Sequence, residues 1–121
     1  MSHSVLSNDS NVFSKPPLEY LNGSSSNDAN HISGPSRTGE GLVRSVLKTV
    51  KRAGIHLNEI DHISAHGTGT VFNDNMESIA FSRLELSNIP LNSLKSYFGH
   101  TLGAAGVVET SMVLQQIRNQ I

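Results

Sequence analysis

Beyond residue 38 this sequence alternates between segments with apolar residues at helical spacing and short apolar runs of the kind that form strands. The predicted elements, in chain order, are a helix over residues 39–53, a strand over 59–65, a helix from Asp74, a strand over 93–98 and a helix through Ile117. Parallel strands need a crossover connection, and helices between them pack on the faces of the sheet. We therefore expect an α/β sandwich whose functional groups gather on loops at strand ends.

The ends of the predicted helices carry their own signals. Glu40 lies early in the first helix, where the helix dipole favours an acid, and Gly54 follows the last helical residue as a stop. Asp74 is expected to cap the second helix, with Glu77 three residues later completing a capping box. Glu77 therefore has a structural explanation that is independent of any chemistry.

The first 38 residues are rich in Ser, Asn, Gly, Pro and Asp, with only short apolar groups such as residues 18–21. This composition favours loop with at most one strand, and residues 24–28 favour a turn. We expect a flexible N-terminal segment over residues 1–17, followed by one domain over residues 18–121.

Composition excludes several classes of function. The 121-residue chain has a formal net charge of -1, and its nine Lys and Arg residues form no block, so a nucleic-acid partner is not expected. No apolar run reaches membrane-spanning length and the N-terminus is polar, which predicts a cytoplasmic protein without a membrane span. The absence of cysteine removes any disulfide, thiolate metal site or cysteine nucleophile from this chain.

Two histidines each follow a predicted strand inside a loop rich in Gly and Thr. His66 lies within Ala-His-Gly-Thr-Gly-Thr at residues 65–70, and His100 precedes Thr-Leu-Gly-Ala-Ala-Gly at residues 101–106. The start of the following helix disfavours an imidazolium at His100, which leaves a neutral ring that donates one hydrogen bond. The remaining histidines are interpreted as surface or structural residues: His3, His31, His56 and His62.

The loop after His66 also offers binding groups. Adjacent glycines let a substrate approach the backbone closely, and the hydroxyls of Thr68 and Thr70 are suited to a polar, amide-bearing ligand arm. Ordinary turn chemistry is the alternative explanation for these threonines.

Other familiar motifs fail on their spacing. His62 and His66 have the separation of the histidine pair in a zinc-protease helix, but Ile63 replaces the catalytic Glu and the segment is predicted as strand. Phe72 stands where a dinucleotide-binding loop needs its third glycine, and the sequence contains neither a Gly-Lys-Ser/Thr loop nor a Gly-x-Ser-x-Gly elbow. We predict no metal site, nucleotide site or serine-hydrolase site.

Three linked stretches resemble the C-terminal half of β-ketoacyl-acyl-carrier-protein synthases. They are residues 25–41, residues 65–70 with Asn73, Asp74 and Glu77, and residues 93–109. The resemblance covers roughly residues 18–121 and implies the thiolase fold, in which two similar α/β halves pack into a layered core. The chain would then be one incomplete C-terminal half, with a mixed sheet and helices packed on it.

This family joins an acyl group to a malonyl unit with loss of carbon dioxide. By position, the resemblance implies that the active-site histidines are His66 and His100, the lysine is Lys95 with its partner Glu109, the acidic pair is Asp74 and Glu77, and the phosphopantetheine tunnel is lined by Thr68 and Thr70. Decarboxylation leaves an enolate, so two neutral imidazole donors hold the developing oxyanion, each worth about 3–4 kcal/mol. Lys95 is expected to orient His66 while Glu109 compensates its charge. The chain needs no cofactor of its own, because the acyl carrier protein brings the phosphopantetheine.

The resemblance also implies what the chain lacks. The acyl-accepting cysteine belongs to the family's first half, and the chain stops at Ile121, before the final strand and the glycine-rich gating loop. We therefore expect no condensation by the chain alone. The expected partners are acyl carrier protein, a Cys-bearing N-terminal half or another synthase subunit, and further copies in a homo-oligomer. An apolar helix over residues 104–117 favours such association.

Two alternatives stay open. The chain is also consistent with a non-catalytic, truncated or split module that binds carrier protein or another subunit, although such a module has no chemical need for both histidines and Lys95. A thiolase that cleaves ketoacyl-CoA fits less well, because the second histidine loop resembles the decarboxylating synthases more closely.

Overall fold

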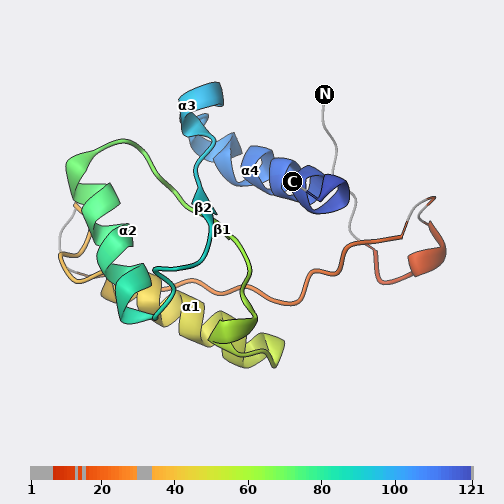
Figure 1. Cartoon of the computed structure of the whole chain (residues 1–121), viewed down its shortest axis with the longest axis horizontal. Coiled ribbons are helices and arrows are strands. Elements are labelled where there is room, and N and C mark those ends of the chain that lie inside the picture. The colour runs from red at the N-terminus through yellow and green to blue at the C-terminus, as the bar shows by residue number, and fades with distance from the viewer. Residues whose placement is uncertain (1–6, 13, 15, 30–33, 121) are drawn as a thin grey trace. The chain divides into compact units, whose positions relative to one another are not determined.

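The computed structural model describes residues 7–12, 14, 16–29 and 34–120 (Figure 1). The chain divides into two compact units, Leu21–Gly99 and the two chain ends, Met1–Tyr20 with His100–Ile121. Two of the histidines interpreted as structural, His3 and His31, lie outside the described residues. Every described helix is too short or too polar to cross a membrane.

The unit Leu21–Gly99 contains the predicted alternation of helices and strands. Its elements are α1 (Glu40–Ala53), η2 (Leu57–Glu59), β1 (Ile63–Ser64), α2 (Val71–Arg83), β2 (Leu91–Asn92) and α3 (Lys95–Phe98). β1 and β2 pair in parallel, with Ile63 opposite Leu91 and Ser64 opposite Asn92. α2 provides the crossover that parallel strands require. The α/β prediction is confirmed, and the described sheet is one parallel pair.

Two glycines in the left-handed conformation bound α1, as the sequence predicts for its end. Gly54 has a φ of 71° and its amide bonds to the carbonyl of Val50, which stops the helix. Gly39 has a φ of 63° and lies against α2, where a Cβ would meet Ala80 and the carbonyl of Met76. Gly39 therefore sets how closely α1 and α2 approach.

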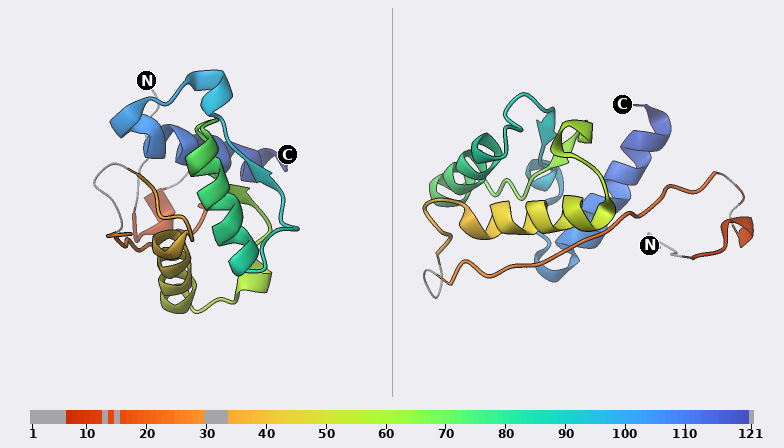
Figure 2. Two further views of the ribbon diagram at one scale, coloured as in Figure 1. Left: turned by 90° about the vertical axis from the view of Figure 1, so that its left-hand side faces the viewer. Right: turned by 90° about the horizontal axis from the view of Figure 1, so that it is seen from below.

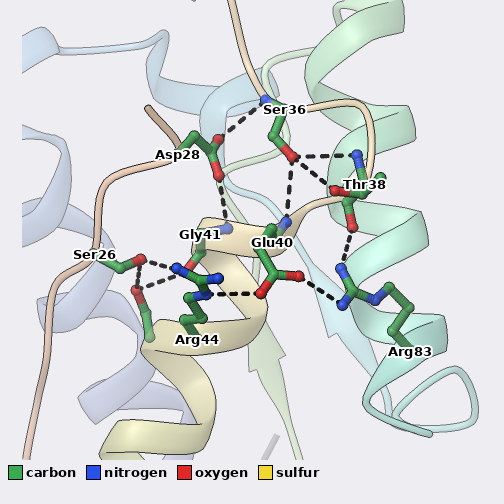
Figure 3. Close-up of polar contacts among 9 residues, drawn as sticks. Ser26, Asp28, Ser36, Thr38, Glu40, Gly41, Arg44 and Arg83 are labelled. Carbon is green, nitrogen blue, oxygen red and sulfur yellow. Dashed lines mark hydrogen bonds and ion pairs between the residues drawn. The ribbon is translucent and has the colours of Figure 1, made fainter. Parts of the chain in front are cut away.

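The first turn of α1 is capped by the loop that precedes it. Ser36 Oγ accepts a hydrogen bond from the amide of Glu40 (3.2 Å), and Asp28 Oδ1 accepts one from the amide of Gly41 (2.7 Å) (Figure 3). These amides have no partner inside the helix, so the two side chains replace the bonds that the helix cannot make. The polar composition before residue 38 thus serves to start α1.

Part of the same loop region runs beside α1 in extended form (Figure 2). Ser24 Oγ donates to the carbonyl of Ser45 (2.7 Å), and Ser26 Oγ donates to the carbonyl of Gly41. These contacts join serine hydroxyls to a helix surface instead of pairing backbone with backbone. The described residues of the first 38 accordingly contain η1 (Ser10–Val12) and no strand.

The core lies where α1, α2 and the strand ends meet. Its buried members are Val43, Ala65, Ala80, Phe81, Leu84 and Leu86. α1 and α2 lie side by side (Figures 1 and 2). The apolar face of α1, formed by residues at helical spacing, therefore packs against α2, as an amphipathic helix requires.

An ion-pair network also joins α1 to α2. Arg83 Nη2 contacts Glu40 Oε2 (2.7 Å), Arg83 Nη1 donates to the carbonyl of Thr38 (2.6 Å), and Arg44 Nε contacts Glu40 Oε1 (2.7 Å) (Figure 3). The hydrogen bonds from the Arg83 and Arg44 guanidinium groups lower the pKa of Glu40 below its ordinary value. Glu40 thus connects both helices through one carboxylate.

The prediction of a strand over residues 93–98 is wrong. The strand is β2, Leu91–Asn92, and Lys95–Phe98 form the short helix α3. The carbonyl of Leu94 accepts the amides of Tyr97 (3.0 Å) and Phe98 (3.2 Å), which closes a helical turn. A short apolar run does not distinguish a strand from one helical turn, because both place apolar side chains close together.

The predicted strand over residues 59–65 is shorter than expected. Glu59 ends η2, where its carboxylate accepts the amide of His56 (2.7 Å) and closes the turn. Strand pairing begins at Ile63 and reaches Ala65, whose amide bonds to the carbonyl of Asn92 (2.9 Å). The two-residue partner β2 limits the length of the ladder.

The predicted capping box at the start of the second helix is also wrong. α2 begins at Val71 with Thr70 as its N-cap, and the amide of Asp74 already bonds to the carbonyl of Thr70 (3.0 Å). Asp74 lies exposed inside the first turn, while the carboxylate of Glu77 is used elsewhere. The periodic pattern begins later than the helix because Val71 and Phe72 are exposed.

The unit formed by the chain ends contains η3 (Leu102–Ala104) and α4 (Ala105–Asn119), which confirms the predicted final helix. Thr101 and Leu102 have φ values of 51° and 46°, so non-glycine residues adopt the left-handed conformation directly after His100. Such backbone costs about 1–3 kcal/mol per residue and often accompanies functional loops.

Gly39→Ala should destabilise the protein more than Gly54→Ala. Both positions have positive φ, which costs alanine about 1–2 kcal/mol. At Gly39 the new Cβ would also lie 2.7 Å from Ala80 Cβ and 2.9 Å from the Met76 carbonyl oxygen, whereas nothing lies within 4 Å at Gly54. Overpacking adds about 1–3 kcal/mol. Urea unfolding followed by circular dichroism measures both losses, and equal losses would contradict the close α1–α2 contact.

Arg83→Gln should destabilise the protein above the ordinary pKa of Glu40 and progressively less in acid. The folded pKa of Glu40 is lowered, so its ion pairs contribute fully above the unfolded pKa and are lost as pH falls through the folded pKa. The free energy of unfolding, measured from about pH 6 to about pH 3, should show a shrinking difference between wild type and variant. Arg52→Gln, an exposed change on α1, is the control and should show a constant difference.

Candidate functional site

The loop of His66 leaves the end of β1. Ala65, which is 4% exposed, is held by its bond to the β2 backbone, and the next residue, His66, is exposed. Backbone pairing with β2 therefore ends one residue before His66, as expected for a functional group at the end of a strand.

Glu77 holds the backbone of this loop from α2. Its Oε1 accepts the amide of His66 (2.8 Å) and its Oε2 accepts the amide of Gly67 (2.7 Å). The side chain is nearly inaccessible, with 7% of Glu77 exposed. A buried carboxylate is stable only when its oxygens are bonded, and charge-assisted bonds of this kind are stronger than neutral ones. Glu77 is thus brought together with His66, through the backbone and not through the capping box.

Ser93, immediately after β2, approaches the same loop from the other side. Its hydroxyl lies 3.0 Å from the carbonyl oxygen of Gly67 and 3.3 Å from that of His66. Sequence reasoning missed Ser93 as a site residue, because 26 residues separate it from Gly67 and no local pattern connects them. Only the parallel pairing of the two strands brings these positions together.

Thr68 and Thr70 are also brought together, and Asn73 joins them. The two hydroxyls lie 2.9 Å apart, and Asn73 Nδ2 donates to Thr68 Oγ1 (3.2 Å) and Thr70 Oγ1 (3.0 Å). One threonine donates to the other and both accept from Asn73, so these bonds leave one hydroxyl proton of the pair for a ligand acceptor. The position of Asn73, three residues after the N-cap Thr70, is the feature of the sequence from which this contact could have been predicted.

An open cavity of about 830 Å³ lies beside Thr70, between the loop at residues 34–38 and the start of α2. Thr70, Phe72 and Asn73 line it from α2 and its cap, and Arg37 lies on the loop side. Its charged and hydroxyl groups suit a polar ligand more than a hydrocarbon. Among the described residues, no three His, Asp or Glu side chains gather closely enough to hold a metal ion.

The second histidine loop is described along the chain. Lys95 is the first residue of α3 and is half-buried. Gly99 ends α3 with a φ of 73°, and its backbone N–H donates a hydrogen bond to the carbonyl of Lys95 (2.8 Å). His100 is exposed and Glu109 is half-buried on α4. His66 and Lys95 belong to the unit Leu21–Gly99, while His100 and Glu109 belong to the other unit.

Glu77→Gln should destabilise the protein by about 2 kcal/mol and speed amide exchange at His66 and Gly67. Glutamine offers one oxygen to two amide donors, and its NH₂ group would face the second donor, which leaves a buried group unpaired. Glu85→Gln, at an exposed acid just beyond α2, is the matched control. Equal unfolding free energies for the two variants would contradict this role of Glu77.

Comparison with known sequences gives consistent matches. Residues 19–121 match the family described as Beta-ketoacyl synthase, C-terminal domain. The chain is 46% identical over 99 residues, 79% of its length, to 3-oxoacyl-[acyl-carrier-protein] synthase 2 of Rhizobium meliloti, of which it covers 23%. It is 38% identical over 91 residues, 75% of its length, to the polyketide biosynthesis malonyl-ACP decarboxylase PksF of Bacillus subtilis, of which it covers 21%.

The chain is also similar to solved structures of ketosynthases. A type II PKS acyl-carrier protein in complex with its ketosynthase matches with a TM-score of 0.76 and 36% identity, over 80% of this chain and 24% of that one. The ketosynthase ApeO in complex with its chain length factor ApeC, from Xenorhabdus doucetiae, matches with a TM-score of 0.78 and 39% identity, over 82% of this chain and 25% of that one.

The chain therefore spans about a quarter of the length of these relatives. Its helices and small parallel sheet are part of the C-terminal half of a thiolase-like ketosynthase fold. On the match of residues 19–121, the chain belongs to the β-ketoacyl synthase family, whose C-terminal domain it carries.

Proposed function

We propose that this chain supplies the decarboxylation side of a β-ketoacyl synthase, in which His66 and His100 stabilise the enolate oxygen of a malonyl thioester. The observation that carries the proposal is the His66 loop, where a buried carboxylate fixes two consecutive amides and leaves the imidazole exposed at the end of a strand. Preorganised donors stabilise a developing oxyanion best, because they need no rearrangement during the reaction.

The proposed step begins on the malonyl thioester. The bond between the α-carbon and the carboxylate breaks, carbon dioxide leaves, and the electron pair moves toward the thioester oxygen to form an enolate. His66 and His100 donate hydrogen bonds to that oxygen. The enolate carbon then attacks an acyl thioester, a carbon–carbon bond forms, and the thiolate that carried the acyl group leaves.

The thiol that carries the acyl group as a thioester has to come from another polypeptide or segment, because this sequence contains no cysteine. Acting on malonyl thioesters does not itself require that thiol. The name of PksF as a malonyl-ACP decarboxylase supports decarboxylation as a separable activity within the family.

Lys95 and Glu109 are proposed as supporting residues. Ser93 contacts the His66 loop two residues before Lys95, which supports a position for the lysine near the first histidine. A lysine there orients the neutral imidazole, and Glu109 balances its charge. Asp74, which is exposed in the first turn of α2, is proposed only as a further supporting residue.

The substrate arm is proposed to be the phosphopantetheine of acyl carrier protein. The remaining hydroxyl proton of the Thr68–Thr70 pair suits one of the amide carbonyls of that arm, and the cavity beside Thr70 gives it access. The ketosynthase complexes with acyl-carrier protein and with chain length factor support carrier protein and a second subunit as partners. Homo-oligomerisation, fatty-acid or polyketide context and a cytoplasmic location stay predictions.

A non-catalytic partner module is the second candidate. Large apolar side chains of η3 and α4 are exposed, including Leu102 (79%), Val107 (57%) and Ile117 (55%), which favours a covering partner. This observation is compatible with the catalytic proposal, since the half that bears the cysteine would cover the same helix.

The test is a chimera in which residues 19–121 replace the matching region of the R. meliloti synthase. We expect malonyl thioester decarboxylation and condensation by the chimera and no condensation by the 121-residue chain alone. His66→Ala or His100→Ala should lower decarboxylation by about 10²–10³-fold. His62→Ala, at an exposed histidine four residues before His66, is the control and should leave the rate unchanged. Full decarboxylation in both single variants would refute the proposal.

A further inference from the structure

We propose that Ser93 is a positioning residue for His66, an inference that rests on the proposed function of that histidine. The Ser93 hydroxyl lies within reach of two consecutive carbonyl oxygens, those of Gly67 at 3.0 Å and His66 at 3.3 Å. A hydroxyl has one proton, so it alternates between these acceptors or is shared by them. In either case the hydroxyl holds the peptide that carries the imidazole.

Ser93 completes a clamp whose other side is Glu77. The carboxylate of Glu77 accepts both amides of the His66–Gly67 pair, while Ser93 donates to both carbonyls. All four backbone polar groups of these two residues are therefore held by side chains. The backbone at His66 is fixed from α2 on one side and from the β2–α3 connection on the other, which limits the directions in which the imidazole can point.

The fit between Ser93 and Gly67 is close. Gly67 has a φ of 46°, and a Cβ at this position would lie 2.7 Å from Ser93 Oγ and still closer to Ser93 Cβ. Only glycine admits the serine side chain at this distance. The hydroxyl thus reaches the carbonyls because the glycine has no side chain.

Ser93 is itself held in place by the sheet. The preceding residue, Asn92, pairs with Ser64 of β1. Ser64 lies two residues before His66, the first residue that Ser93 contacts. Two residues later α3 begins at Lys95. Ser93 therefore links the first histidine loop to the segment that contains Lys95.

Amide hydrogen exchange in the 121-residue chain tests this role without any assay of activity. Ser93→Ala should speed exchange at His66 and Gly67 roughly tenfold, because one hydrogen bond to the loop is lost. Exchange at Leu84, whose amide bonds to Ala80 in the core, should not change. Ser96→Ala, at an exposed serine on α3, is the matched control and should change none of the three.

Kinetic measurements on the chimera provide a second test of this proposal. Ser93→Ala should lower kcat for malonyl thioester decarboxylation roughly tenfold while KM stays within about twofold, because a misdirected imidazole weakens transition-state binding alone. Unchanged exchange at His66 and Gly67, an equal rise at Leu84, loss of the folded state, or an unchanged kcat would each overturn the proposal. Absence of decarboxylation by the unsubstituted chimera would instead refute the proposed function, while a selective rise in exchange would still assign the clamp to Ser93.

Discussion

Within the unit Leu21–Gly99, a buried carboxylate joins α2 to the loop of His66. Glu77 lies three residues before Ala80, which is fully buried, in a helix whose inner face forms the core. Burying an ionised side chain costs several kcal/mol unless its oxygens are bonded, and both are bonded to backbone amides of one loop. The position of α2 and the conformation of the His66 loop therefore depend on each other.

The other contacts of the unit Leu21–Gly99 keep α2 in the place where this bond is made. α1 packs against α2 through Gly39, and Glu40 and Arg83 join the same helices at the surface. α1 in turn starts at Ser36 and Asp28, side chains of a loop with little regular structure. This polar segment therefore affects the histidine loop indirectly. It starts α1, α1 packs against α2, and α2 carries the carboxylate that bonds the loop.

Membership of the β-ketoacyl synthase family is the basis on which we propose a chemical role for these contacts. An oxyanion donor is effective when its direction is set before the reaction, and direction is set by backbone as much as by side chain. In this chain a carboxylate and a hydroxyl, neither near His66 in sequence, hold the backbone from which the imidazole extends. The chain lacks cysteine, so this machinery serves the malonyl side of the condensation in our proposal.

Periodicity and turn chemistry were sufficient to predict α1, α4 and the alternation of helices and strands, since these depend on residues that lie within a few positions of one another. His66 and His100 were singled out from the glycines beside predicted strand ends; the structure has a strand before His66 and the helical turn α3 before His100. The helical turn at Lys95–Phe98, the role of Glu77 and the contact of Ser93 were not predicted. The contacts of Glu77 and Ser93 join groups 10 to 27 residues apart in the sequence. The short apolar run at Lys95–Phe98 is compatible with a strand or with a helical turn. The sequence by itself therefore determined which groups are available for chemistry. Tertiary structure decided which backbone they hold, because only the pairing of β1 with β2 and the packing of α2 bring them to the same loop.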